Sequence, residues 1–439
     1  MDGDLNASTQ WKLGTASVDI TPSEPMWLAG WAARREPASG TATPLRARAL
    51  AMEDAAGERL VICTVDLIAI TRDIVEPVAA QIFARHGIPR EHFLFNASHT
   101  HTGPEIRPDK VPFFDIPDEY ARKIVPYRTW LIEHLAGIID HALATMEPVE
   151  LFATSTSCEV AENRRKPPGP VDSDVPILFA VNSERHVIAL LFGYACHNLT
   201  LPASFVSYCG EFLGVGSEYI KIIFPEAMVF YLPGAGADIN PKPEPIDPTA
   251  SEYPDAEDNL TRAHGLEIGA AVAYEVLDLQ GSQLAGPLRI AYSETQLDFE
   301  PLPSRAQLEA DLACDDPPKR TKARYLLDQL DAGNDFPASY PCPLQVVSFG
   351  NDLLLIAMSA EPVVQYALDF KKQYGPGMVW VAGYCNDMFG YLATREIQEQ
   401  GGYEGGRATL WSALPGPFTR ATEDRVRRAV DELVQKVRE

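Results

Sequence analysis

Apolar positions along the chain follow two alternating periods, one typical of β-strands and one typical of amphipathic helices. A short apolar run at residues 59–66 precedes a helical pattern at residues 73–86 that Gly87 can end, and a second run follows at residues 92–97. The same succession recurs toward the end of the chain. It predicts an α/β fold of mixed β-sheets flanked by helices.

The remaining elements are predicted from the same two periods. Further strands are expected at residues 176–181, 187–194, 228–232, 287–297, 344–349, 352–358 and 378–383. Further helices are expected at residues 119–146, 260–279, 307–330, 362–372 and 420–437. Stretches 164–176 and 233–258 interrupt the pattern and read as surface loops. No repeat or flexible linker divides the chain, so residues 10–439 are expected to form one large domain, with a smaller unit around 285–345 as the alternative.

Charge and composition narrow the classes of partner. The chain has 439 residues, 46% of them hydrophobic, which is enough for a sizeable core, and its net charge is -24. This charge would repel nucleic acid and anionic lipid surfaces, and no basic cluster opposes it. No nucleic-acid partner is therefore expected.

Targeting and cysteine patterns are also informative. No apolar run is long enough to span a bilayer, and the start of the chain lacks the basic end and apolar stretch of a secretory signal. The chain as given is expected to be cytoplasmic, or secreted if a signal was trimmed from it. The seven cysteines are scattered and form no Cys-x-x-Cys pair, so neither a disulfide framework nor a thiolate zinc site is predicted.

Candidate metal ligands stand directly after predicted strands. His99 and His101 follow the strand at 92–97, and in an extended segment their side chains point the same way, so that one can bind metal while the other faces substrate. His197 follows the strand at 187–194, and Glu361 lies between the strand at 352–358 and a predicted helix. A fourth polar loop, 384–395, follows the last strand. Alone, each of these residues is more often a buried hydrogen-bonding group or a helix-dipole partner than a ligand, and it is their coincidence at strand ends that favours a catalytic zinc site.

Five widely spaced segments resemble the neutral/alkaline non-lysosomal ceramidase family. They are Ser98-His99-Thr100-His101-Thr102-Gly103-Pro104, Phe192-Gly193-Tyr194-Ala195-Cys196-His197, Pro233-Gly234-Ala235-Gly236-Ala237-Asp238-Ile239-Asn240-Pro241, Ser359-Ala360-Glu361-Pro362, and the pair Tyr391-Leu392-Ala393-Thr394-Arg395-Glu396 with Tyr403-Glu404-Gly405-Gly406. The match runs from about Gly14 to Arg407 and corresponds to the catalytic domain. The chain as given stops at Glu439 without the C-terminal β-sandwich of the family.

The resemblance implies a zinc-dependent amidohydrolase of the N-acylsphingosine type, as in bacterial sphingolipid metabolism, with a small-molecule or lipid-like substrate. It implies the zinc ligands His99, His197, Glu361 and Tyr391. It further implies that His101, Arg164 and Tyr403 face the substrate, with Arg165 as the alternative to Arg164. Asp238 or Asp387 could orient a metal-binding imidazole, or could simply cap a loop.

Three functions remain open at this stage. The first is a ceramidase-like amidase, in which a zinc-activated water attacks the carbonyl and His101 or a tyrosine returns a proton to the leaving amine. The second is a zinc hydrolase or lyase of the same scaffold that acts on a polar substrate such as a carbohydrate or a small amide. The third is a non-catalytic binding protein.

Overall fold

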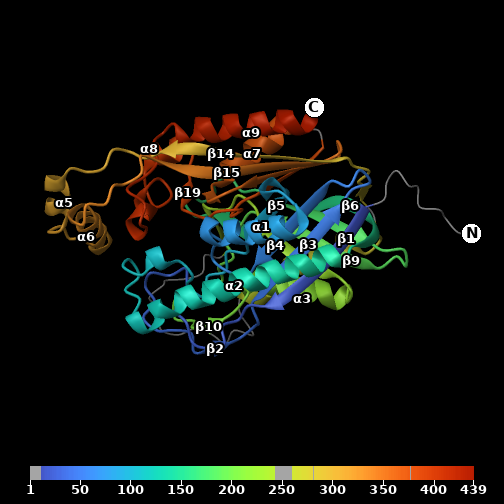
Figure 1. The fold of residues 1–439 in the computed structure, drawn as a ribbon, viewed down its shortest axis with the longest axis horizontal. Coiled ribbons are helices and arrows are strands. Elements are labelled where there is room, and N and C mark those ends of the chain that lie inside the picture. Colours follow the sequence, from blue (N-terminus) through green and yellow to red (C-terminus); the bar gives the residue numbers. More distant parts are fainter. Residues whose placement is uncertain (1–10, 243–259, 280, 376) are drawn as a thin grey trace, which may run out of the picture.

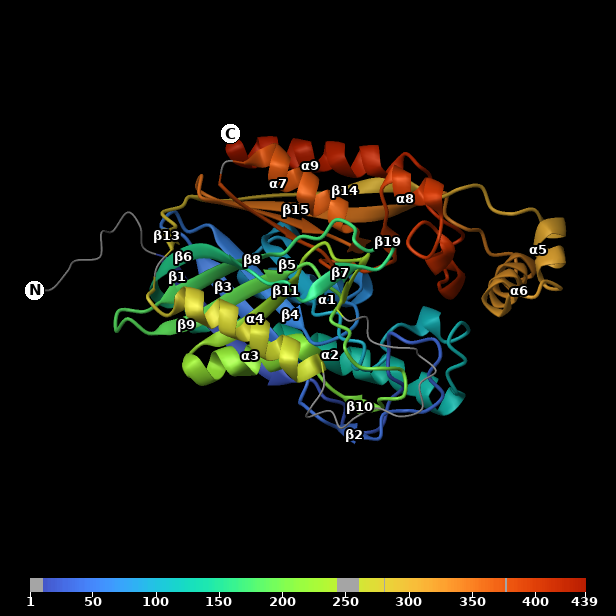
Figure 2. The ribbon, with the colours of Figure 1, turned by 180° about the vertical axis from the view of Figure 1, so that it is seen from behind.

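Two β-sheets lie face to face, and helices cover the outer side of each, as the two opposite views in Figures 1 and 2 show. The computed structural model describes residues 11–242, 260–279, 281–375 and 377–439. Both sheets contribute to one shared core, in which Trp11 and Leu50 of the larger sheet meet Val347 and Trp380 of the smaller one. The predicted mixed sheets with flanking helices are therefore confirmed.

The larger sheet has the strand order β11-β9-β8-β6-β1-β3-β4-β5, with β13 beside β6. Its strands are β1 (Trp11–Asp19), β3 (Arg46–Glu53), β4 (Arg59–Val65), β5 (Phe93–Ala97), β6 (Glu147–Ser157), β8 (Asp174–Val181), β9 (Val187–Tyr194), β11 (Met228–Pro233) and β13 (Ser282–Gln283). The pairs β4–β5 and β9–β11 are parallel, whereas the others are antiparallel.

The smaller sheet has the order β14-β15-β16-β18. Its strands are β14 (Leu288–Asp298), β15 (Ser339–Phe349), β16 (Leu353–Met358) and β18 (Met378–Ala382). Three short pairs lie outside the two sheets: β2 (Gly40–Thr41) with β10 (Ser207–Tyr208), β7 (Ala161–Asn163) with β12 (Ile239–Pro241), and β17 (Glu361–Pro362) with β19 (Tyr391–Leu392). The pair β17–β19 becomes important for the candidate site.

Three groups of helices cover the outer sides of the two sheets. Helices α1 (Arg72–His86) and α2 (Asp118–Ala144) lie on one half of the larger sheet, and α3 (Glu211–Ile223) and α4 (Leu260–Val276) lie on the other half. Helices α7 (Val364–Tyr374) and α9 (Thr422–Arg438) cover the smaller sheet. Helices α5 (Arg305–Asp311) and α6 (Pro317–Asp331) form a hairpin that projects at one end of the molecule (Figure 1). The short elements are α8 (Arg395–Gln400) and the 3-10 turns Arg90–His92, Pro108–Lys110 and Arg407–Trp411.

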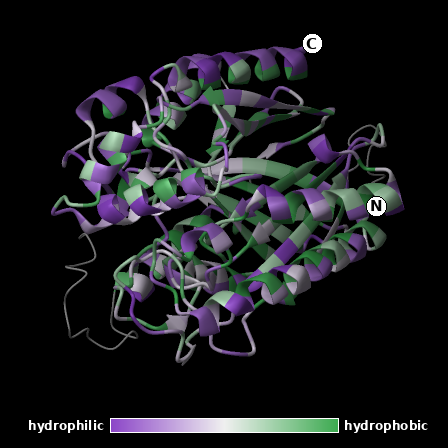
Figure 3. Cartoon of the chain, turned by 60° about the vertical axis from the view of Figure 1, so that its left-hand side comes forward, coloured by the Kyte–Doolittle hydropathy of each residue, from purple (hydrophilic) through white to green (hydrophobic). Residues whose placement is uncertain are grey.

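Strand positions alternate between the two sides of each sheet. In β3, Ala47 and Ala49 face helices α1 and α2, whereas Leu50 and Met52 face the smaller sheet. Where both sides are covered, as in β4, β9 and β16, the strand is apolar at nearly every position. Figure 3 shows hydrophobic strands beneath helices with hydrophilic outer surfaces. Among the described residues, no helix is both long and apolar enough to cross a membrane.

Several predicted bounds change in the structure. The helix predicted at 307–330 is two helices, because Pro317 and Pro318 cannot lie in a helix interior and instead begin α6. Helix α3 and strands β1, β3 and β6 were not predicted. Helix α3 contains Gly214 and Gly216, which lower its helix propensity, and Gly216 allows close contact with α4. The predicted loop 164–176 ends where β8 begins, and residues 243–258 of the other predicted loop lie outside the described residues.

The larger sheet curls, so that its two edge strands, β5 and β11, approach each other. The end of β18 lies beside both of them: Asn96 pairs with Cys385 and Gly234 pairs with Ala382. The carboxyl ends of strands from both sheets therefore meet in one place.

Candidate metal centre

The loops that follow β5 and β18 are tied together by hydrogen bonds between buried groups. The side-chain amide of Asn96 donates to the carbonyl of Gly383 at 2.8 Å, and the backbone N–H of Asn386 donates to the carbonyl of Phe95 at 2.7 Å. The amide oxygen of Asn386 in turn accepts from the N–H of Phe95 at 3.1 Å. These bonds place His99, at the end of β5, against residues that come from the smaller sheet.

His99 and His197 are each held by a bond from Nδ1 to the backbone. Nδ1 of His99 lies 2.7 Å from the carbonyl oxygen of Ile68, and Nδ1 of His197 lies 2.9 Å from that of Gly236. A carbonyl can only accept, so Nδ1 carries a hydrogen in both rings, and Nε2 is the ring nitrogen left to face a cation. Both side chains are at most 3% exposed. This orientation by the second ring nitrogen is typical of metal-binding histidines.

The carboxylate of Glu361 lies between Nε2 of His99 and Nε2 of His197. Its Oε2 is 3.4 Å from Nε2 of His99 and 3.5 Å from Nε2 of His197. This buried oxygen accepts no hydrogen bond from any described residue. Ligands on one tetrahedral zinc, at bonds of about 2.0–2.1 Å, stand about 3.3–3.4 Å apart, so the three atoms fit a shared cation.

Protonation of these groups suits a metal site. Burial lowers the pKa of His99 to about 3, against the opposing attraction of Glu361 and with help from His197. Burial alone would raise the pKa of Glu361, but His99, His197 and the Tyr391 hydroxyl outweigh it and lower that pKa to about 2. Near neutral pH the site therefore presents a neutral imidazole beside a carboxylate, which is a donor set that zinc accepts.

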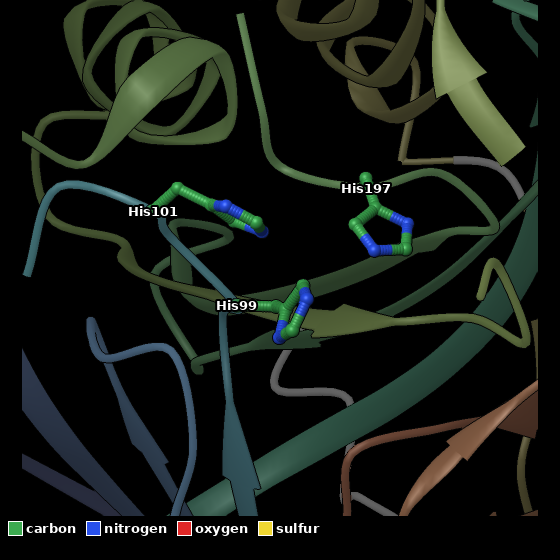
Figure 4. Close-up of side chains that lie close together, drawn as sticks. All are labelled: His99, His101 and His197. Atoms are coloured by element: carbon green, nitrogen blue, oxygen red, sulfur yellow. The ribbon is translucent and has the colours of Figure 1, made fainter. Parts of the chain in front are cut away.

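His101 completes a cluster of three buried imidazoles, which point toward one another in Figure 4. The ligand atoms of His99, His101 and His197 all lie within 4.8 Å of one another. Both ring nitrogens of His101 are buried and lack a hydrogen-bond partner within the part of the chain that the structure describes. Burial also holds the pKa of His101 well below its usual value, with both neighbouring imidazoles adding to the shift. His101 is thus available either to a metal or to a substrate.

Tyr391 and Arg164 lie beside this cluster. The pair β17–β19 sets Tyr391 directly opposite Glu361. Nη2 of Arg164 lies 3.4 Å from the Tyr391 hydroxyl, and the Arg164 guanidinium lies 5.8 Å from the centre of the Tyr403 ring. Both arginines bond Glu404, Arg164 at 2.8 Å and Arg165 at 2.5 Å, and Arg165 also bonds the carbonyl of Gly401 at 2.9 Å. Of the two arginines, Arg164 is the one that reaches the cluster.

Among the described residues, neither Asp238 nor Asp387 forms a hydrogen bond to an imidazole of the candidate metal site. Asp238 accepts from Asn163 at 2.9 Å and from the N–H of Val364 at 2.8 Å, so it caps the start of α7. Asp387 accepts from Arg72 at 3.0 Å and from Tyr340 at 2.9 Å. Backbone carbonyls orient His99 and His197 instead, and Asp238 has the capping role that was the alternative expectation.

A cleft of about 440 Å³ opens over His99, His101 and Glu361. Its lining includes charged side chains from two segments, Arg72 and Asp73 on one and Arg107, Asp109 and Lys110 on the other, together with Arg128. Aromatic and proline residues also line it, namely Phe114, Tyr340, Phe389, Trp411, Pro415, Pro417 and Phe418. The volume suits a ligand of drug-like size, and the lining suits one with a polar and an apolar part.

Several residues near the cluster were not singled out from the sequence. The Tyr384 ring lies 4.4 Å from that of His99, centre to centre, and is fully buried. His99, Glu211, Ala360, Tyr384 and Asn386 have backbone φ between 53° and 61°, a region that non-glycine residues rarely adopt. Such strain gathers at functional sites. Tyr384 had a usable signal, because it follows the strand predicted at 378–383, whereas Glu211 had none.

Comparisons with known proteins were made for the whole chain. No protein-family model matches it, and no curated protein gives a significant match. Solved structures do match: a neutral ceramidase from Pseudomonas aeruginosa and a ceramidase complexed with C2, both at a TM-score of 0.73 and 19% identity. The alignments cover 97% of this chain, and 74% and 75% of the two ceramidase chains.

This chain has the ceramidase fold. The fold that the sequence motifs implied is thereby confirmed over nearly the whole chain. At 19% identity the likeness concerns the arrangement of the backbone, and the chemistry has to be argued from the side chains described above.

Proposed function

We propose that this protein is a zinc-dependent hydrolase that cleaves the amide bond of an N-acyl compound. The observation that carries the proposal is the meeting of Nε2 of His99 and Nε2 of His197 at Oε2 of Glu361, at 3.4 and 3.5 Å. This buried carboxylate oxygen has no hydrogen-bond donor among the described residues, and a cation held between it and the two nitrogens would compensate its charge. His99, His197 and Glu361 would hold the zinc, with the Tyr391 hydroxyl as the fourth donor.

Zinc bound there would supply Lewis acidity, polarising a carbonyl and lowering the pKa of a water molecule toward neutrality. The other steps fall to the protein. Arg164 and Tyr403 stand beside Tyr391 and can donate hydrogen bonds to the oxygen on which negative charge develops. His101 is neutral with both ring nitrogens unpartnered among the described residues, so it can accept a proton from water and pass it to the leaving amine.

His101 is the alternative third ligand, because it lies in the same cluster as His99 and His197. The ligand set with Glu361 is preferred for a physical reason. Replacing Glu361 by His101 would leave the carboxylate oxygen buried, charged and unpaired, which is costly. In the preferred set this oxygen is satisfied and His101 stays free to face substrate.

The cleft supports an amphipathic substrate. Charged residues such as Arg107 and Lys110 suit a polar head, and aromatic residues such as Phe389 and Trp411 suit an acyl chain. The ceramidase fold of the two solved structures favours a long-chain N-acyl amide such as ceramide. The number of charged side chains favours the second candidate, a small polar amide or a carbohydrate derivative, on the same metal centre.

Zinc content and turnover test the proposal together. Purified protein should contain about one zinc per chain and should release fatty acid from labelled ceramide, with a His99→Ala variant as the blank. Turnover of small amides or glycosides alone would select the second candidate. Bound zinc without turnover of any acyl amide, ester or glycoside would indicate a binding protein, and protein that takes up no zinc would contradict the proposal.

A further inference from the structure

His101 raises a specific question of position. Within the described chain, neither of its ring nitrogens is hydrogen-bonded, so nothing holds the ring in the way that backbone carbonyls hold His99 and His197. A group that transfers a proton must nevertheless be kept within a few tenths of an ångström of its working position. The restraint has to act on the His101 backbone or through packing against the ring.

Glu211 provides a restraint on the backbone. Its Oε1 accepts a hydrogen bond from the His101 N–H at 3.3 Å. Its Oε2 accepts from the N–H and the hydroxyl of Thr200, the latter at 3.1 Å, and from the N–H of Leu201 at 3.3 Å. Thr200 and Leu201 belong to the loop that carries His197. One carboxylate therefore joins the loop after β5 to the loop after β9.

The position of Glu211 costs conformational and solvation free energy. The side chain is completely buried, and its backbone has φ of 53°, which only glycine and a few small polar residues adopt readily. A buried carboxylate is also unfavourable unless it is well bonded, and here several donors satisfy it. Costs of this kind persist where a residue has a function that a neutral or apolar residue could not supply.

A second restraint acts on the His101 ring. Gly30 lies so close that a Cβ at this position would stand 2.5 Å from Nδ1 of His101. The buried Arg34 donates to the carbonyl of Ala29 at 2.7 Å, which fixes the segment beside Gly30. Arg34 also attracts Glu211 electrostatically. Glu211 thus restrains the His101 backbone, and Arg34 restrains the segment that packs against the His101 ring.

We propose that Glu211 is a positioning residue for His101: by bonding the His101 N–H and the Thr200–Leu201 segment at once, its carboxylate sets where the His101 ring stands relative to the metal ligands. This inference rests on the proposed function only in taking His101 as the residue that faces the substrate. It assigns no proton transfer and no metal contact to Glu211 itself.

Glu211→Gln separates this role from a general structural one. Glutamine keeps the volume, and its oxygen can keep the Thr200 and Leu201 donors, but its NH2 group then faces the His101 N–H, donor against donor. Thr200→Val is the matched control, because it removes only the hydroxyl donor to the same carboxylate and keeps the backbone N–H bonds of Thr200, Leu201 and His101 that the proposal depends on. Zinc content and melting temperature are measured on both variants, together with kcat, KM and histidine-selective 15N NMR, with His101→Gln used to assign the signal.

In Glu211→Gln we expect kcat to fall at least about 10-fold while KM stays within about 3-fold and zinc content is unchanged, since a small displacement of a catalytic group has a large effect. Thr200→Val should stay close to the wild-type kcat. The His101 ring signals should move in Glu211→Gln alone. If both variants lose activity in parallel with melting temperature and the His101 signals stay put, Glu211 is only structural and the inference is wrong.

The NMR comparison also keeps the two proposals apart. A wild-type protein that hydrolyses none of the test substrates would remove the proposed function. The ring signals of His101 in the two variants would still show whether Glu211 sets its position.

Discussion

Oε2 of Glu361 lies 3.4 Å from Nε2 of His99, and burial together with the bond to Ile68 leaves no proton on that nitrogen to bridge them. The contact is therefore repulsive in the metal-free protein and attractive around a cation. This single relationship determines how the protein should respond to loss of a ligand, to metal removal and to pH.

The first prediction concerns the ligands themselves. His99→Ala, His197→Ala and Glu361→Ala should each weaken zinc binding by more than the 10–100-fold that loss of an outer hydrogen-bond partner typically costs. Zinc affinity measured by competition with a chelator checks this. His141→Ala, an exposed histidine on α2, is the control and should bind zinc like the wild type. Equal affinity in His99→Ala and the control would contradict the ligand assignment.

The second prediction is an inversion of stability in Glu361→Gln. In the metal-free protein, the amide can donate to the Nε2 lone pair of His99, and we expect a gain of about 1 kcal/mol in the free energy of unfolding. In the zinc-loaded protein, the same change removes an anionic ligand and should lower stability. Thermal unfolding with and without a chelator measures both. A variant that is less stable than the wild type in both states would argue against the repulsive contact.

The third prediction concerns pH. His99 and Glu361 bind metal when deprotonated, and their pKa values are lowered to about 3 and about 2, so protons compete for these two ligands only in strong acid. Protein dialysed at pH 5 should therefore keep its zinc, whereas an ordinary histidine, with a pKa near 6.5, would already be protonated. Metal analysis after dialysis at a series of pH values gives the midpoint. Half-loss near pH 6.5 would show that burial does not protect the site.

The fourth prediction tests the wall of the cleft. Lys322 of α6 donates to the carbonyls of Ser412 and Leu414, the first at 2.7 Å, and both of these residues line the cleft. Lys322→Met leaves the two buried carbonyls without their donor and should loosen this wall. We expect KM to rise about 3- to 10-fold with kcat nearly unchanged, because the metal ligands are untouched. Arg305→Ala, on the exposed side of the same hairpin, should leave both constants unchanged.

Sequence patterns located the site residues but could not bring them together. His99 and His197 were assigned to strand ends correctly, because each follows a long apolar run. Their proximity, however, depends on the curl of a sheet in which β5 is an edge strand and β9 is next to the other edge. The order of strands in a sheet is set by packing between distant segments, and local periodicity carries no information about it.

The proximity of Glu361 and Tyr391 could not be predicted from the sequence either, because the strands that bring them together are very short. They face each other through β17 and β19, which have two residues each. No hydrophobic period can be read from two residues, so only the resemblance to a known family suggested Tyr391. Glu211 was missed for a related reason, since it begins a helix rich in glycine and its function depends on four bonds to distant backbone and hydroxyl groups.

The division of the proposed ligands between the two sheets has a consequence for biosynthesis. His99 and His197 follow strands of the larger sheet, whereas Glu361 and Tyr391 follow strands of the smaller one. A ribosome must therefore release residues beyond Tyr391, and the nascent smaller sheet must dock, before any metal can be captured with its full set of donors. Zinc uptake by the emerging chain would then report that the two sheets have closed on each other, long after the histidines themselves have been made.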